Sequence, residues 1–339
     1  MKLVKLQGAG TNKKMSFFCV KKKSRPTSQQ AAMIGESGCP RFAQWVVTHS
    51  ATYATLALAK RAKSAYATNC ARYERLNSVE GGARFGADAF SDLTLEEFSH
   101  RFGGWMGGAA EQKAAALAAG AVATAHAAAP PAVDWRTKGQ VTPVKNQGAF
   151  GTCWSFAVAE NFEGLGVRQG HPLTNVSEQE FIDCCATCQG ASADKSFEWL
   201  SNQTSLDGHP ALESSYVYVG KPGKCLSSTS PAAKAQLHAF GRVSDDGTGV
   251  PIASALAVKG PMGMGVDATC FAGYKGGVIK SCTSKGIDHA VLMVASGEEK
   301  GTSYFTIKNS WGGKWGESGY VRIEQGQTWW GNISTIWTN

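Results

Sequence analysis

Three side chains that lie far apart in the sequence share the chemistry of nucleophilic attack on a carbonyl: Cys153, His289 and Asn309. A thiolate can attack the carbonyl carbon, and an imidazole can hold the thiol proton and then deliver it to the leaving group. An amide can orient that imidazole through its second nitrogen without adding a charge. Because both partners lie far downstream of the cysteine, the three groups can meet only through folding.

A fourth residue, Gln147, stands six positions before the cysteine. Its side-chain NH₂, together with the backbone N–H of Cys153, would form a hole for a developing oxyanion, and losing one such donor typically costs about 10²–10³ in rate. Each of the four residue types also has an ordinary structural explanation, as a buried thiol, a core histidine, a turn asparagine or a solvated glutamine. Their joint presence favours the catalytic interpretation.

The residues after Cys153 predict the helix that must position it. Trp154, Val158, Phe162 and Leu165 recur every three or four positions, which predicts an amphipathic helix over residues 153–168. A thiol in the first turn of a helix lies at the positive end of the helix dipole, which stabilises the thiolate.

Four segments resemble one known family: residues 147–156 (QGAFGTCWSF), 286–291 (GIDHAV), 307–312 (IKNSWG) and 170–179 (GHPLTNVSEQ). The chain, from about Phe42 to its end, resembles papain-family cysteine peptidases of the cathepsin L branch, and residues 170–179 are most similar to the kinetoplastid members. The resemblance implies an α+β fold with a helical lobe, an antiparallel β-barrel lobe and an active-site cleft between them. It implies a cysteine endopeptidase made as a zymogen that works through a thiolate–imidazolium pair and an acyl-enzyme, with Trp311 shielding the His289–Asn309 pair. No cofactor or metal is expected.

The resemblance also implies an inhibitory pro-domain. Tyr66, Asn69, Tyr73 and Asn77 fall on one face of a predicted helix, and residues 86–92 continue the pro-segment pattern. An alanine-rich stretch then suits a cleavable linker. We therefore expect four parts: a basic N-terminal segment over 1–40, the pro-domain over 41–104, the linker over 105–131 and the peptidase domain over 132–339.

Within the peptidase part, further helices are predicted over 177–185 and 196–201, and strands over 289–294, 304–308 and 320–323. By alignment, Gly265 and Thr335 provide a P2 pocket that has room and no charge, so we expect a preference for apolar P2 residues. The full set of residues that the resemblance places at the substrate is Gly190, Ala191, Ser192, Ala193, Gly265, Ile287, Asp288, Trp311 and Thr335.

The cysteines predict a disulfide framework. Without the nucleophile, the peptidase part has six: Cys184, Cys185, Cys188, Cys225, Cys270 and Cys282. Against the family pattern, Phe150 and Trp330 stand where two partner cysteines are expected, so Cys188 and Cys282 need new partners. We expect Cys270–Cys282, and Cys188 bonded to either Cys184 or Cys185, with the other of these two bonded to Cys225. No second Cys-x-x-Cys pair is present at zinc-site spacing.

The disulfides and three glycosylation sequons, at Asn175, Asn202 and Asn332, favour an acidic, lysosome-like vesicle or secretion. Residues 1–25 carry eight basic side chains and no acid, which accounts for the whole net charge of +8. Three explanations stay open for this segment: a wrongly assigned start that omits a signal peptide, an unusual targeting peptide, or a disordered basic arm for anionic surfaces. The first agrees with the cysteines and the sequons.

The expected partners are protein or peptide substrates, the chain's own pro-segment as an intramolecular inhibitor, and cystatin-type inhibitors. The remainder of the chain is electrically balanced, so no nucleic acid is expected, and no apolar run has the length of a membrane span. We expect a monomer. The alternative function is a non-catalytic secreted homologue that binds peptides or pro-segments, and reaction with a thiolate-directed epoxide separates the two.

Overall fold

The computed structural model describes residues 39–78, 82–104, 130–190, 193–203, 208–226 and 229–337. Contacts divide the chain into two compact units. Unit 1 comprises the residues up to Glu96 together with Ala272–Lys275, and unit 2 comprises Glu97–Phe271 and Gly276–Asn339. Nearly all of the expected basic segment and of the expected linker lies outside the described residues.

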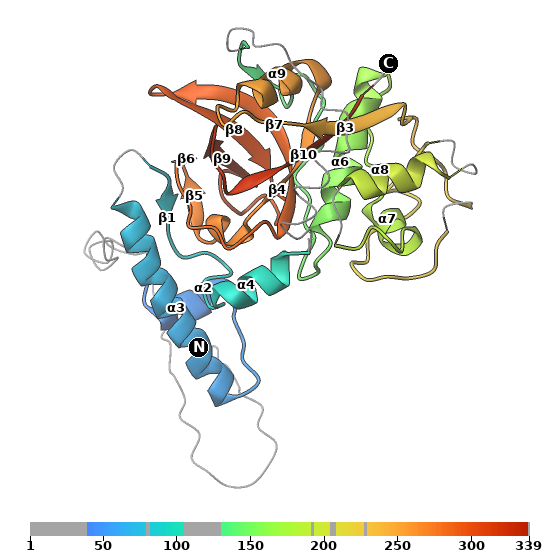
Figure 1. The fold of residues 1–339 in the computed structure, drawn as a ribbon. Helices are drawn as coiled ribbons and strands as arrows, with labels where there is room; N and C mark the ends of the chain where they lie inside the picture. The colour runs from blue at the N-terminus through green and yellow to red at the C-terminus, as the bar shows by residue number, and fades with distance from the viewer. Residues whose placement is uncertain are drawn as a thin grey trace. The chain divides into compact units, whose positions relative to one another are not determined.

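Unit 1 is built around two helices, α2 (Phe42–His49) and α3 (Leu56–Asn77), and contains the start of α4 (Leu95–Phe102) (Figure 1). The face of α3 that the spacing predicted is buried, including Tyr66, Asn69 and Tyr73. The Asn69 side-chain amide donates to the carbonyls of Ser91, at 2.9 Å, and Leu93, at 2.7 Å. An asparagine on the buried face therefore secures the chain that follows the helix.

A disulfide that the sequence analysis did not anticipate joins Cys39 to Cys70 and so ties the chain before α2 to the middle of α3. Unit 1 also contains a two-stranded sheet of β1 (Arg84–Phe85) and β5 (Tyr274–Gly276). Next to this sheet, the Arg72 guanidinium donates to the Ala272 carbonyl at 2.6 Å. The segment Ala272–Lys275, far along the sequence, is thus part of the unit formed by the pro-segment.

Unit 2 contains the helices α6 (Cys153–Arg168), α7 (Glu178–Cys184), α8 (Ala193–Ser201) and α9 (Val250–Lys259). Helix α6 has the bounds that the periodicity predicted, and it is buried over almost its whole length, from Cys153 to Gly166. Its Phe162 packs against Phe181 of α7 and Phe197 of α8. These contacts make α6 the centre of the helical lobe.

The β lobe of unit 2 is one sheet with the strand order β3-β10-β4-β7-β8-β9-β6, to which β2 adds by pairing with β7. The fold class is confirmed, with one correction: β6 pairs with β9 in parallel, so the sheet is mixed and not purely antiparallel. The strands are β2 (Val133–Asp134), β3 (Ala239–Val243), β4 (Met262–Val266), β6 (Val278–Ile279), β7 (His289–Glu299), β8 (Thr302–Lys308), β9 (Tyr320–Glu324) and β10 (Trp330–Trp337).

Buried charges connect the helices with the sheet. Lys308 of β8 is completely buried and lies 2.8 Å from Glu160 of α6. Lys145 lies 2.6 Å from Glu163 of the same helix and also pairs with Glu178 of α7. Burial raises the pKa of Glu178 to about 8, against the lowering effect of Lys145.

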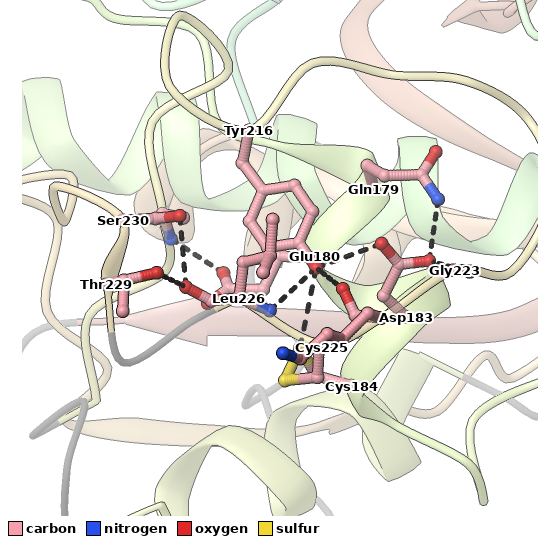
Figure 2. The surroundings of a disulfide bond; sticks show 12 residues. Gln179, Glu180, Asp183, Cys184, Tyr216, Gly223, Cys225, Leu226, Thr229 and Ser230 are labelled. Carbon is pink, nitrogen blue, oxygen red and sulfur yellow. Dashed lines mark hydrogen bonds between the residues drawn. A yellow bond between two sulfur atoms is a disulfide. The ribbon is translucent and has the colours of Figure 1, made fainter.

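The cysteines of unit 2 pair as Cys184–Cys225, Cys185–Cys188 and Cys270–Cys282. The sequence left open which of Cys184 and Cys185 bonds to Cys225. In the structure Cys184 bonds to Cys225, and Cys185 bonds to Cys188. Figure 2 shows the first of these bonds at the end of α7. Among the described residues, Cys153 is the free cysteine, and it is buried.

No helix in the described part of the chain is long and apolar enough to cross a membrane.

Candidate active site

Cys153 is the first residue of α6 and is completely inaccessible to solvent. Its sulfur accepts a hydrogen bond from the backbone N–H of Ala290 in β7, at 3.4 Å. The nucleophile at the start of the central helix therefore lies directly against the strand that carries His289. This contact joins the helical lobe to the β lobe at the reacting atom.

His289 and Asn309 are brought together by neighbouring strands. β7 begins at His289 and pairs antiparallel with β8, which ends just before Asn309. The ring nitrogen Nε2 of His289 lies 2.9 Å from Oδ1 of Asn309. Trp311 stacks on the imidazole with ring centroids 4.9 Å apart, as the shielding hypothesis requires.

The other ring nitrogen, Nδ1, makes no hydrogen bond of regular geometry to a described residue, and the Phe102 carbonyl acts on the ring only by raising its pKa slightly. The Asn309 amide accepts at Nε2, so the imidazole carries its proton there, and Nδ1 is the nitrogen that can take a proton from a thiol. The amide thus selects the tautomer that suits a general base.

Gln147 is held by Ser310, a residue that the sequence analysis did not single out. The Gln147 backbone N–H donates to the Ser310 carbonyl at 2.8 Å, and the Ser310 hydroxyl donates to Gln147 Oε1 at 2.6 Å. This arrangement turns the NH₂ end of the glutamine side chain toward the carbonyls of Phe150, at 2.7 Å, and Phe102, at 3.5 Å. The proposed oxyanion donor therefore already faces a carbonyl oxygen of the pro-segment.

Residues Glu97–Gly104, from the expected pro-segment, belong to unit 2 and lie over the site. We call this segment the cover. The rings of Phe98 and Phe102 lie 5.2 and 4.9 Å from the Trp311 ring. Ser99 donates a hydrogen bond to the Asp288 carboxylate, and the Gly104 N–H donates to the Asp288 carbonyl at 3.0 Å.

Glycine is required where the cover passes the nucleophile. A Cβ on Gly104 would overlap the Gly151 carbonyl, and a Cβ on Gly151 would lie 3.2 Å from the Gly104 Cα. The two backbones are therefore in direct contact beside Cys153; position 104 has no room for a side chain, and position 151 has room only if its neighbours shift slightly.

Burial under this cover makes the reacting pair neutral. Burial raises the pKa of the Cys153 thiol to about 11, although the backbone N–H groups of Ala290, Gly104 and Trp154 lower it. Burial lowers the pKa of His289 to about 4, against the smaller raising effects of Asn309 and the Phe102 carbonyl. In the covered state, at a pH between about 4 and about 11, the thiol and the imidazole are therefore both neutral, and the thiolate–imidazolium pair is disfavoured.

The residues expected at the substrate are only partly brought together. Gly265 pairs with Gly331 of β10, and a Cβ on Gly331 would lie 3.6 Å from Ile287 Cδ1, so these three positions are neighbours. Thr335 is fully buried and pairs with Gly241 of β3. Gly190 lies in the turn after the Cys185–Cys188 disulfide, and Ala193 begins α8.

Asp288 and Trp311 both lie beneath the cover, as described above. Ala191 and Ser192 lie outside the described residues. Gly331 was not anticipated, because a lone glycine in a strand has no chemical signal of its own. The serine in the sequence Asn309-Ser310-Trp311 was a possible clue to Ser310, since it adjoins two assigned residues.

Two sequence profiles match the chain. The one described as "Papain family cysteine protease" matches residues 129–337, and the one described as "Cathepsin propeptide inhibitor domain (I29)" matches residues 42–98. Among solved structures, digestive procathepsin L 3 of Tenebrio molitor larval midgut superposes with a TM-score of 0.71 at 28% identity, covering 87% of this chain and 97% of that one. A recombinant stem bromelain precursor gives a TM-score of 0.74 at 26% identity over 88% of this chain and 98% of that one.

Curated relatives agree. A "Cysteine proteinase" of Trypanosoma brucei brucei is 41% identical over 253 residues, which are 72% of this chain and 54% of that protein. "Cysteine proteinase B" of Leishmania mexicana is 35% identical over 322 residues, 92% of this chain and 71% of that protein. The chain thus spans about half the length of the first and less than three quarters of the second. The matches over both parts of the sequence, with the Cys153–His289–Asn309 arrangement, show that this chain belongs to the papain family of cysteine proteases and carries a cathepsin-type propeptide inhibitor domain.

Proposed function

We propose that this chain is the precursor of a cysteine endopeptidase in which Cys153 is the nucleophile, His289 the acid–base group, Asn309 its orienting partner and Gln147 an oxyanion donor. The observation that supports this most directly is the arrangement around β7. The Ala290 N–H contacts the Cys153 sulfur, and the neighbouring His289 presents Nε2 to Asn309, which leaves Nδ1 as the nitrogen that can receive the thiol proton.

The proposed reaction begins when the thiol proton passes from Cys153 to Nδ1 of His289. The thiolate then attacks the carbonyl carbon of a peptide bond, and the oxygen takes the negative charge beside the Gln147 NH₂ and the Cys153 N–H. The imidazolium protonates the leaving amine and the C–N bond breaks, which leaves a thioester on Cys153. A water molecule, deprotonated by His289, attacks the thioester, and the thiolate leaves to restore the starting state.

Latency is explained by the cover, Glu97–Gly104. Its Phe102 carbonyl lies 3.5 Å from Gln147 Nε2, where a substrate carbonyl would bind, and its Gly104 contacts Gly151. The segment therefore occupies the place of a substrate while burial keeps the thiol protonated. We propose domain limits at 41–104 for the inhibitor and 132–339 for the peptidase, with processing between them.

For the substrate we propose an apolar P2 residue, because the neighbouring positions Gly265, Ile287 and Gly331 are small or apolar and bring no carboxylate. An arginine there would have to be buried without a partner. Profiling the activated enzyme with a peptide library is expected to give bulky apolar residues at P2, and a dominant arginine would overturn the pocket assignment. We further propose a monomer in an acidic vesicle or outside the cell, open to cystatin-type inhibitors.

The test uses the full-length precursor and its Cys153→Ala variant. After incubation in acid, the wild-type chain is expected to lose its pro-segment, to hydrolyse peptides and to incorporate one equivalent of an epoxide that alkylates cysteine-peptidase thiolates. The variant should remain full-length, fold with the same circular dichroism spectrum and incorporate none. Peptide hydrolysis by the variant at a comparable rate would refute the assignment of the nucleophile. A wild-type chain that binds peptides but neither reacts nor cleaves would favour the non-catalytic alternative.

A further inference from the structure

Thr152 immediately precedes the nucleophile at the N-cap of α6, yet its hydroxyl makes no capping bond to the helix. A threonine at this position ordinarily accepts a hydrogen bond from the N–H of the second or third helical residue. Here its Oγ1 lies 2.6 Å from the hydroxyl oxygen of Tyr218. The first-turn N–H groups act elsewhere: that of Ser155 donates to the Thr152 carbonyl at 3.0 Å, and that of Trp154 lowers the pKa of the adjacent Cys153 thiol.

The protons of this contact can be assigned. The Tyr218 hydroxyl donates to the Gln147 carbonyl at 2.8 Å, and a carbonyl can only accept. The Thr152 hydroxyl must therefore donate to the Tyr218 oxygen. Burial raises the pKa of Tyr218 to about 12, so the phenol keeps its proton in the neutral and acidic range. One phenol thus links the residue before the nucleophile to the residue that carries the oxyanion donor.

The phenol itself is firmly held. Its ring meets the ring of Phe156 in α6 edge-on, with centroids 4.9 Å apart. The Tyr218 N–H donates to Glu213 at 3.1 Å, and the next N–H along the chain, that of Val219, donates to Gln179 Oε1 at 2.8 Å. The hydroxyl therefore stays between Thr152 and Gln147 by packing as well as by hydrogen bonding.

We propose that Tyr218 is a positioning residue of the peptidase. Its hydroxyl keeps Thr152 from capping α6, which leaves the Trp154 N–H to the Cys153 sulfur, and it holds the Gln147 backbone in place beneath the oxyanion donor. The proposal rests on the peptidase function given above. Tyr218 acts through Thr152 and Gln147 and touches none of the reacting atoms.

Removing this hydroxyl has two expected effects. The Thr152 side chain is no longer held toward Tyr218 and can rotate so that its oxygen accepts from the first-turn N–H groups. The Cys153 thiolate then loses a donor, and the thiol becomes less acidic. The Gln147 carbonyl loses its donor as well, so the oxyanion site becomes less well ordered. Asp288 also raises the pKa of the thiol, and His289 is its proposed acid–base partner; the substitution leaves both residues unchanged.

The chain offers a matched control two residues away. Tyr216 and Tyr218 lie close together in the sequence, but their hydroxyl groups have different hydrogen-bond partners. The Tyr216 hydroxyl donates to Asp183 at 2.9 Å and accepts from the Leu226 N–H at 3.1 Å, beside the Cys184–Cys225 disulfide (Figure 2). Replacing Tyr216 with phenylalanine removes a hydrogen-bonded phenol group and leaves the contacts at the start of α6 unchanged.

The experiment compares full-length wild type, Tyr218→Phe and Tyr216→Phe, each activated in acid and counted by epoxide titration. For Tyr218→Phe we expect kcat to fall roughly tenfold with KM within about threefold, the size expected for one misplaced hydrogen bond. The midpoint of the pH dependence of iodoacetamide inactivation should move to higher pH by about one unit, or tenfold in thiolate population. Tyr216→Phe should match the wild type in both readouts.

A second pair of variants covers the case in which Tyr218→Phe does not accumulate. Thr152→Val removes the same hydrogen bond from its other end, and Thr152→Ser keeps the hydroxyl. Valine has no hydroxyl with which to cap α6, so Thr152→Val should keep the wild-type inactivation midpoint. It should lose kcat, because the Tyr218 phenol then has one anchor fewer beside Gln147, whereas Thr152→Ser should stay closer to the wild type.

The outcomes separate the two proposals. A wild-type chain that takes up no epoxide refutes the peptidase function itself. A reactive wild type with Tyr218→Phe indistinguishable from Tyr216→Phe, or with Thr152→Val equal to Thr152→Ser, refutes only the role of Tyr218.

Discussion

Burial keeps the imidazole of His289, which we propose as the acid–base group, neutral over a wide pH range. Its ring is completely buried, and this lowers its pKa from the ordinary 6.5 to about 4. Once the cover leaves, the ring regains water and its ordinary affinity for protons. Between these two pKa values the open site binds more protons at His289 than the closed site does. Acid therefore favours opening, by roughly 3 kcal/mol over the whole interval.

Asp288 opposes this effect, because burial raises the pKa of its carboxyl in the closed state. The contribution of His289 can be isolated in a precursor that cannot cut itself, the Cys153→Ala variant. Hydrogen exchange of residues 97–104, corrected for the intrinsic rate, should accelerate up to about 100-fold from pH 6.5 to pH 4. In a Cys153→Ala, His289→Asn double variant most of this acceleration should vanish. An equal slope in the two proteins would show that another group drives opening.

At the scale of elements, α4 closes the site through a few aromatic contacts. Phe98 and Phe102 are each 2% exposed, and both rings meet Trp311, which itself stacks on His289. The cover and His289 therefore pack against the same side chain, the indole of Trp311. Latency should therefore depend on this small apolar contact more than on the exposed face of the helix.

Replacing Phe102 with alanine should loosen the cover, because truncating a buried phenylalanine typically costs about 3–5 kcal/mol. The uncut Phe102→Ala precursor should react with the epoxide at neutral pH much faster than the wild-type precursor. His100→Ala, on the exposed side of the same helix, is the control and should react as slowly as the wild type. A Phe102→Ala precursor that stays unreactive would mean that the glycines, not the aromatic rings, carry the closure.

A comparison of α6 with β4 shows why some elements could be predicted from the sequence and others could not. α6 follows from the spacing of Trp154, Val158, Phe162 and Leu165. β4 has the sequence Met-Gly-Met-Gly-Val, in which alternate glycines weaken any strand signal, and its pairing with β7 and β10 on both sides supplies the stability instead. The motifs indicated Cys153, His289, Asn309 and Gln147 as one group, whereas the contacts of Ser310 and Tyr218 with Gln147 exist only after folding.

The molecule as a whole also depends on charges that it buries. Lys308 is a strand residue with no exposed surface in its side chain, and its ammonium meets Glu160 at 2.8 Å and Thr142 at 2.9 Å. The pair links β8, which ends just before Asn309, to α6, which begins at Cys153. A buried ion pair of this kind adds little net stability but is costly to break on one side.

Lys308→Met should therefore lower the free energy of unfolding by about 3–5 kcal/mol, since Glu160 is left buried without its partner. Adding Glu160→Leu should restore a large part of the loss. Denaturant unfolding of the Cys153→Ala precursor carrying each change provides the measurement. A double variant no more stable than Lys308→Met would contradict the view that the unpaired carboxylate causes the loss.

The contact between Gly104 and Gly151 predicts how a mutation at position 104 would be inherited. Most damaging substitutions in an enzyme lower its activity, and one intact copy of the gene can compensate for them. Any side chain at position 104 instead collides with the Gly151 carbonyl and pushes the inhibitory segment off the nucleophile. On the function proposed above, such an allele would encode a peptidase that acts without processing, and its effect is expected to be dominant.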